Sequence, residues 1–135
     1  MALFTWNSSY SVSVEQFDTE HQKLFALVNE LNDAMRAGQG RFVLRNVLDS
    51  LIAYTNQHFT AEERAMKATR FPEYEAHAEE HSRLTAQVHD FAKQFEAGET
   101  AITIDVLYFL RDWLVNHIVT TDKKYSQHLK NYGMA

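Results

Sequence analysis

Four stretches of this 135-residue chain place apolar side chains at alternating spacings of three and four residues. That spacing puts them on one face of an α-helix, so each stretch predicts an amphipathic helix. The breaks between the stretches are short. The whole chain contains only four glycines and one proline, the residues that interrupt helices, which favours long helices. The predicted helices cover residues 18–37, 41–69, 72–96 and 102–119.

Short connections force consecutive helices to run in opposite directions. We therefore predict an all-α fold, an antiparallel up-down-up-down four-helix bundle, in a single domain that covers residues 1–135. Thr19 is the expected N-cap of the first helix, and the glycines around Gly38 end it. Pro72 marks the start of the third helix, because proline is tolerated in a first turn and breaks a helix interior.

The two ends of the chain lie outside this helical pattern. Residues 1–17 contain Trp6, Tyr10 and Phe17. We predict that they form a non-helical arm packed over the bundle. The polar tail, residues 120–135, has room for a short fifth helix.

Composition excludes several classes of function. The chain has no cysteine, which rules out disulfides, thiolate metal ligands and a cysteine nucleophile. A net charge of −5 without a run of Lys or Arg argues against nucleic acid or an anionic membrane as a partner. Since we find neither a signal-peptide pattern nor a long apolar run, we expect a cytoplasmic protein without membrane insertion, as a monomer or weak oligomer.

Seven histidines are present, and five of them stand where the predicted apolar faces turn polar. In an antiparallel bundle the starts of the first and third helices lie beside the ends of the second and fourth. The side chains at these places are His21, His58, Glu62, His77, His81 and His117. The two pairs within one helix are four residues apart and share a face. All six are predicted to converge on one small volume.

Asp122 follows His117 at a separation of five residues. At about 100° per residue this is a rotation of roughly 140°, so a regular α-helix would turn Asp122 away from the interior. We therefore predict a wide turn, a π-bulge or a helix break between Ile118 and Asp122. Such irregularities are common at functional sites.

A single histidine on an apolar face is usually a satisfied core or boundary residue. Five imidazoles and two carboxylates buried together are different, because desolvated charges and unpaired polar groups cost several kcal/mol each. The cluster therefore predicts a bound metal held by nitrogen and oxygen. Such sites take zinc or manganese as well as iron. His89 and His128 lie off this face and are predicted to be surface residues.

The order and spacing of these residues resemble the hemerythrin family. A histidine is followed by H-x3-E, H-x3-H and H-x4-D motifs, and the resemblance runs from about Trp6 to Leu129. Each motif alone is ordinary, but their combination in this order is specific. The resemblance implies reversible binding of molecular oxygen at a non-heme di-iron centre, for carriage, storage or delivery, and no enzymatic activity.

The family's metal ligands can be carried over position by position. The resemblance implies one iron held by three histidines and a second held by two, with both carboxylates and a solvent-derived oxo or hydroxo group bridging the pair. Counting ligands leaves one position open for dioxygen, on the iron with two histidines. The residues are His77, His81 and His117 for the first iron, His21 and His58 for the second, and Glu62 and Asp122 as bridges.

Six further residues are candidates because they stand close to these ligands in the sequence. Four are expected to wall a dry oxygen pocket: Leu24, Phe59, Leu114 and Ile118. Trp113 and Tyr125 are expected to orient ligands or close the site. Plain core packing is the competing explanation for all six.

Two other functions stay open at this point. The same centre would suit an enzyme that reduces peroxide, nitric oxide or oxygen, but the sequence nominates neither an acid or base at the open iron nor an electron-donor site. A sensor of oxygen or redox state would have to act through a separate partner.

Overall fold

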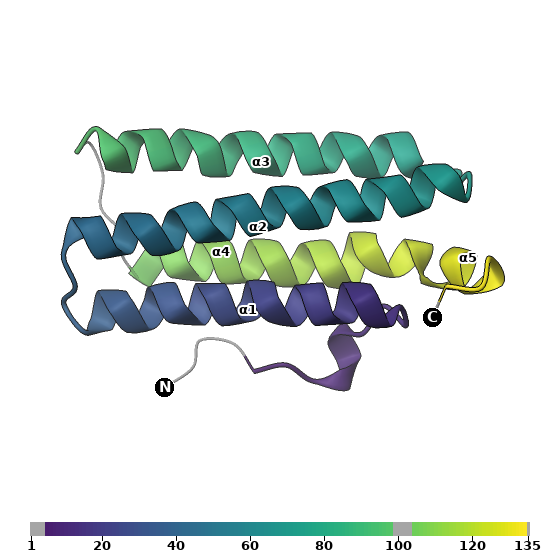
Figure 1. Ribbon diagram of the computed structural model, residues 1–135, viewed down its shortest axis with the longest axis horizontal. Coiled ribbons are helices and arrows are strands. Elements are labelled where there is room, and N and C mark those ends of the chain that lie inside the picture. The colour runs from purple at the N-terminus through teal and green to yellow at the C-terminus, as the bar shows by residue number, and fades with distance from the viewer. Residues whose placement is uncertain (1–4, 99–103, 135) are drawn as a thin grey trace.

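The structure is a computed structural model that describes residues 5–98 and 104–134. Every regular element in these ranges is helical, which confirms the all-α prediction. Four long helices lie side by side and run alternately in opposite directions (Figure 1). In chain order the elements are η1 (Ser8–Tyr10), α1 (Glu15–Arg36), α2 (Arg41–Ala68), α3 (Tyr74–Glu96), α4 (Ile104–Asn116), η2 (His117–Thr121), η3 (Asp122–Tyr125) and α5 (Ser126–Asn131).

The core follows the predicted apolar faces along the length of the bundle. Leu24, Leu31, Leu48, Leu107 and Leu114 are almost completely shielded from solvent. Burying one leucine side chain stabilises a fold by about 1.5–3 kcal/mol. The aliphatic side chains of the helices therefore supply most of the stability. They offset the free-energy cost of the polar side chains buried at one end of the bundle.

The turn between α1 and α2 depends on Gly38. Its φ of +70° lies in the left-handed region that favours glycine. In this conformation its amide donates to the carbonyl of Met35 at 3.1 Å, and the amide of Gln39 donates to Ala34 at 3.1 Å. The predicted stop is confirmed, because these bonds satisfy the last carbonyls of α1.

Two predicted helix starts are wrong by a few residues. Helix α1 begins at Glu15 and its N-cap position is Val14, so Thr19 does not cap it. The cause is Asp18, whose carboxylate accepts from the Ser11 hydroxyl at 2.6 Å and the Val12 amide at 2.8 Å. Asp18 thus ties the arm to a helix that is already formed.

Helix α3 begins at Tyr74, two residues after Pro72, which lies in the turn that precedes it. The start predicted for the fourth helix, residue 102, lies outside the described residues.

The arm and the tail both pack on the bundle. The rings of Trp6 and Tyr10 lie 5.4 and 5.3 Å from that of Phe25 on α1. The arm includes one short 3-10 turn, η1, so it is not wholly non-helical as predicted. The short fifth helix expected in the tail is present as α5.

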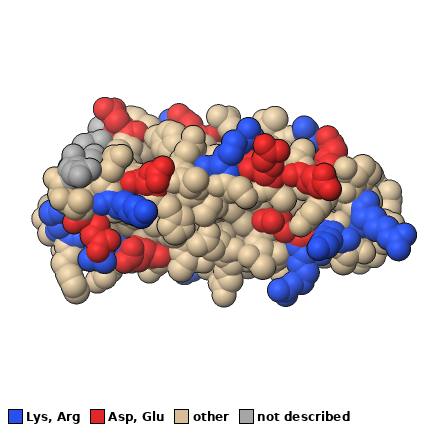
Figure 2. All heavy atoms as spheres, turned by 90° about the horizontal axis from the view of Figure 1, so that it is seen from above, with Lys and Arg blue, Asp and Glu red and all other residues tan. Residues whose placement is uncertain are grey.

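The surface is charged and mixed. Figure 2 shows both acidic and basic side chains on the face seen there, separated by wide areas of uncharged residues. None of the helices in the described residues combines the length and apolar character that crossing a bilayer requires.

Substituting Leu107→Ala should lower the free energy of unfolding by about 2–5 kcal/mol, because this fully buried side chain would leave a cavity. Urea denaturation of the metal-free protein, followed by circular dichroism, measures the change. Phe42→Ala is the control, since Phe42 is 77% exposed and its loss should cost little. Equal losses from both variants would contradict the assigned core.

Candidate metal centre

All seven predicted ligand side chains lie together at one end of the bundle, and none is more than 3% exposed. They come from the start of α1, the end of α2, the start of α3 and the segment after α4, as antiparallel topology requires. They are His21, His58, Glu62, His77, His81, His117 and Asp122.

The imidazoles turn their Nε2 atoms toward the two carboxylates. Asp122 receives three of them: Nε2 of His77 lies 2.9 Å and that of His117 3.0 Å from Oδ1. The Nε2 of His21 lies 3.1 Å from Oδ2.

Glu62 also faces three of the imidazoles. Its Oε2 lies 3.3 Å from Nε2 of His21 and 3.3 Å from Nε2 of His58. Its Oε1 lies 3.4 Å from Nε2 of His81. The imidazole of His21 therefore stands between the two carboxylates.

The seven side chains divide into two overlapping groups. Within each group one donor atom per residue lies within 4.8 Å of all the others. The first group is Glu62, His77, His81, His117 and Asp122; the second is His21, His58, Glu62 and Asp122. Because both carboxylates belong to both groups, the arrangement has the form of two adjacent cation sites that share two bridging residues.

Several inward-facing atoms make no hydrogen bond within the described ranges, despite these short separations. They are Nε2 of His21, His58 and His77, Oε1 of Glu62, and both carboxylate oxygens of Asp122. Buried polar atoms without partners are rare because each costs about 1–3 kcal/mol. Cations at the shared centre would satisfy all of them, so the donor set fits a pair of metal ions bound through nitrogen and oxygen.

The predicted irregularity before Asp122 is confirmed. Residues His117–Thr121 form a π-helical turn, η2, followed by the 3-10 turn η3. The wider π turn changes the rotation per residue, so His117 and Asp122 both face the cluster although five positions separate them.

Three glutamates that the sequence analysis did not select support the outer ring nitrogens. The Nδ1 atom of His58 lies 2.5 Å from Glu20, and that of His81 lies 2.9 Å from Glu63. The Nδ1 atom of His117 lies 2.9 Å from Glu80.

Each of these glutamates stands next to a ligand-type residue in the sequence, but its carboxylate contacts a histidine on a different helical segment. Glu20 precedes His21, Glu63 follows Glu62, and Glu80 precedes His81. An acidic neighbour beside a candidate ligand was the sequence signal that could have found them.

Tyr125 is buried against the cluster, and its hydroxyl donates a hydrogen bond to Oε2 of Glu62. Its ring stacks on that of His77, with centroids 5.7 Å apart. Trp113 is only partly buried, and its ring centroid lies 6.3 Å from that of Phe59.

The four residues expected to wall an oxygen pocket are all buried: Leu24, Phe59, Leu114 and Ile118. The ring of Phe59 stacks on the imidazole of His81 at 3.7 Å, almost parallel to it. This contact covers one side of the cluster with an apolar ring.

The two remaining histidines differ from each other. His89 is exposed, as predicted. The surface prediction for His128 is wrong, because its ring is partly buried against Phe71 and its Nε2 lies 2.8 Å from the carbonyl of Thr69. His128 therefore links α5 to the end of α2.

Without a metal, the cluster is held together by opposite charges. Burial alone would raise the pKa of Glu62, yet the charge of His58 and the other imidazoles hold it well below its usual range. Burial and the charge of Glu62 would raise the pKa of Asp122, but His117 and the other imidazoles lower it. In turn, burial lowers the pKa of His58, but Glu62 and the hydrogen bond to Glu20 raise it to about 10. Burial likewise lowers the pKa of His117, but Asp122 and the hydrogen bond to Glu80 raise it to about 10.

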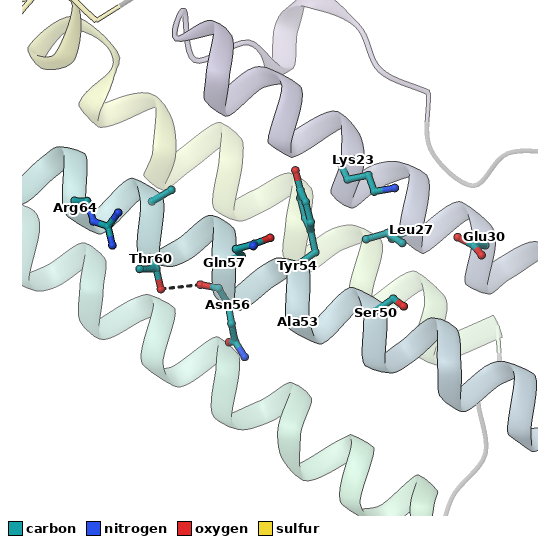
Figure 3. Close-up of a pocket in the computed structure, with 11 residues that line it drawn as sticks. Lys23, Leu27, Glu30, Ser50, Ala53, Tyr54, Asn56, Gln57, Thr60 and Arg64 are labelled. Carbon is teal, nitrogen blue, oxygen red and sulfur yellow. Dashed lines mark hydrogen bonds between the residues drawn. The ribbon is translucent and has the colours of Figure 1, made fainter.

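A broad groove of about 920 Å³ lies between α1 and α2 (Figure 3). Polar side chains such as Lys23, Tyr54 and Arg64 line it together with Leu27. None of the seven clustered residues is among those that line it, so the groove is separate from the candidate metal centre.

Fold and site together define a class: a four-helix bundle with a buried dinuclear site built from five imidazoles and two carboxylates. Residues 12–129 match the family model described as the hemerythrin HHE cation binding domain, so the chain belongs to the hemerythrin family.

Curated relatives and a solved structure agree with this assignment. Bacteriohemerythrin of Methylococcus capsulatus is 39% identical over 93% of this chain and 95% of its own length. Myohemerythrin of Theromyzon tessulatum is 28% identical over 93% of both chains. A crystal structure of wild-type hemerythrin superimposes with a TM-score of 0.89 at 38% identity, covering 95% of this chain and 98% of the other.

Loading the metal-free protein with Fe(II) without oxygen should release protons. His58 and His117, each with a pKa of about 10, are protonated at pH 7 and must lose that proton before Nε2 can bind a cation. Because two protons are displaced, the apparent affinity for iron should increase by about 100-fold for each unit by which the pH rises, up to about pH 10. An indicator dye in weak buffer measures the release. His89→Ala should release as much acid as the unmodified protein, and iron uptake without acid release would contradict the protonated cluster.

Proposed function

We propose that this chain binds molecular oxygen reversibly at a non-heme di-iron centre, for oxygen carriage, storage or delivery. Membership of the hemerythrin family supports this function. The observation that carries it is the pair of overlapping donor groups that share Glu62 and Asp122. A single metal ion would not need two groups of this kind.

In this proposal three histidines hold one iron and two hold the other. The ligands are His77, His81 and His117 for the first, His21 and His58 for the second, with Glu62 and Asp122 bridging both alongside a solvent-derived oxo or hydroxo group. When bound, the two irons supply the electrons that reversible oxygen binding requires. Because His21 and His58 would hold the second iron with one histidine fewer than the first, that iron would have room for oxygen as a further ligand.

The protein's own contribution is to select and hold neutral donors. Imidazoles outnumber carboxylates five to two in the cluster, unlike the carboxylate-rich sites of di-iron enzymes in similar bundles. Fewer negative ligands stabilise highly oxidised iron less well, which favours release of oxygen over oxidation chemistry. This composition supports a carrier over an enzyme.

Apolar side chains around the cluster would keep water away from bound oxygen. We assign this role to Leu24, Phe59, Leu114 and Ile118, each at most 3% exposed. Excluding water limits the delivery of protons and the loss of oxygen in a reduced form. Tyr125 holds Glu62 in place through its hydroxyl, and Trp113 packs behind Phe59. The cytoplasmic location and the weakly associated or monomeric state stay predictions.

Removing a proposed ligand should remove iron. His77→Ala and Glu62→Ala should each lose one or both irons, measured as iron per chain after anaerobic loading and desalting. His89→Ala is the matched control, because His89 is exposed and lies outside both donor groups. Iron loss from His89→Ala with retention in His77→Ala would contradict the assigned ligand set.

Oxygen binding itself is tested by visible absorption of the anaerobic, ferrous-loaded protein as oxygen is admitted and then removed. A charge-transfer band that appears and then disappears is the expected result, since a carrier returns to its starting state. A one-way change to a ferric spectrum would favour an oxidase or peroxidase instead. No coloured species at all would contradict the iron assignment.

A further inference from the structure

Glu80 connects two parts of the site that are distant in the sequence. It lies on α3 directly before His81, and its Oε1 is 2.9 Å from Nδ1 of His117 on η2. The hydroxyl of Thr121, at the other end of the same π turn, donates to both oxygens of Glu80, at 3.1 and 2.9 Å. The carboxylate is therefore held from two positions on η2.

We propose that Glu80 is a positioning residue of the metal centre, acting through His117 and held in turn by Thr121. The inference deepens the proposed function and rests on it for the identity of the metal. The contacts within the protein stand by themselves, because all three side chains are joined by hydrogen bonds without any ion.

The first consequence of this contact is the choice of tautomer. An ionised carboxylate offers only acceptor oxygens, so Nδ1 of His117 must carry the proton and donate it to Glu80. In the neutral ring the lone pair then lies on Nε2, the atom that faces Asp122 and the shared centre. Partners of this kind fix ring orientation and increase the basicity of a metal ligand.

The second consequence concerns the π turn. Thr121 immediately precedes Asp122, the carboxylate that belongs to both donor groups. By holding both ends of η2, Glu80 fixes His117 and the backbone that aims Asp122.

Glu20 and Glu63 have simpler surroundings. Besides its histidine, Glu20 accepts from Gln16 on its own helix. Glu63 is bonded to His81 and has no other hydrogen bond to the part of the chain that the structure describes. Of the three glutamates, Glu80 is thus the one whose loss should disturb a ligand and the turn beside it.

Three variants and one control separate these effects: Glu80→Ala, Glu80→Gln, Thr121→Val and Glu79→Gln. Glu79 is the exposed neighbour on α3, so its substitution makes the same change of charge away from the cluster. Iron affinity is measured anaerobically with Fe(II), together with the midpoint potential and the exchange of the His117 N–H proton by NMR. None of these measurements uses oxygen.

Glu80→Ala should weaken iron binding by about 10- to 100-fold and expose the His117 N–H to rapid exchange. Glu80→Gln keeps an acceptor oxygen, so it should restore affinity and slow exchange. It should still raise the midpoint potential, because a negative charge that favours ferric iron is gone. Thr121→Val should also weaken iron binding and speed the exchange of the His117 N–H, each to a smaller extent than Glu80→Ala. Glu79→Gln should change neither the iron affinity nor the exchange.

Normal affinity, potential and exchange in a folded Glu80→Ala protein would overturn the positioning role. If Glu80→Ala does not fold, the potential of Glu80→Gln against that of Glu79→Gln decides: a selective rise supports the role and equal values refute it. If the unmodified protein fails to bind oxygen while Glu80→Ala still loses iron affinity, the proposed function falls and the positioning role stands.

Discussion

Two buried carboxylates, Glu62 and Asp122, impose the constraint on which the rest of the structure depends. Both are fully shielded from solvent, and burying an uncompensated charge costs several kcal/mol even after relaxation. Each must therefore be surrounded by positive charge, supplied either by protonated imidazoles or by metal ions. Four separate helical segments contribute imidazoles for this purpose, so the compensation of the buried charges depends on how all four pack together.

This requirement explains why the bundle is divided along its length. The end remote from the cluster is filled by aliphatic side chains such as Leu31, Leu48 and Leu107, which stabilise the fold without needing partners. The other end contains polar groups whose inward atoms lack hydrogen bonds in the described chain. The departure from regular helix at η2 belongs to the polar end, where it directs both His117 and Asp122 toward the cluster. The polar cluster is thus confined to one end of helices whose apolar core runs along their whole length.

Much of this arrangement could be predicted from the sequence, because helical periodicity fixes faces and antiparallel topology fixes ends. The five-residue separation of His117 and Asp122 indicated an irregular turn, of which the observed π turn is one of the forms expected. The main errors and omissions concern side chains whose partners lie outside their own helix. Asp18 turns back to the arm, and His128 reaches the carbonyl of Thr69. Glu80 pairs with a ring 37 residues away. Periodicity describes one helix at a time and gives no information about such partners.

The same nitrogen atoms can bind protons or metal ions, and this equivalence bears on how the protein folds. Glu62 and Asp122, with the hydrogen bonds to Glu20 and Glu80, raise the pKa of His58 and His117 to about 10, so in neutral solution these two rings carry protons before any metal enters. Imidazolium rings facing Glu62 and Asp122 supply the compensating charge that the buried carboxylates need. The outer glutamates remain bonded to Nδ1 in either state, since that nitrogen keeps its proton when Nε2 changes partner. The geometry of the site can therefore form first and receive its metal afterwards, with proton release accompanying the exchange.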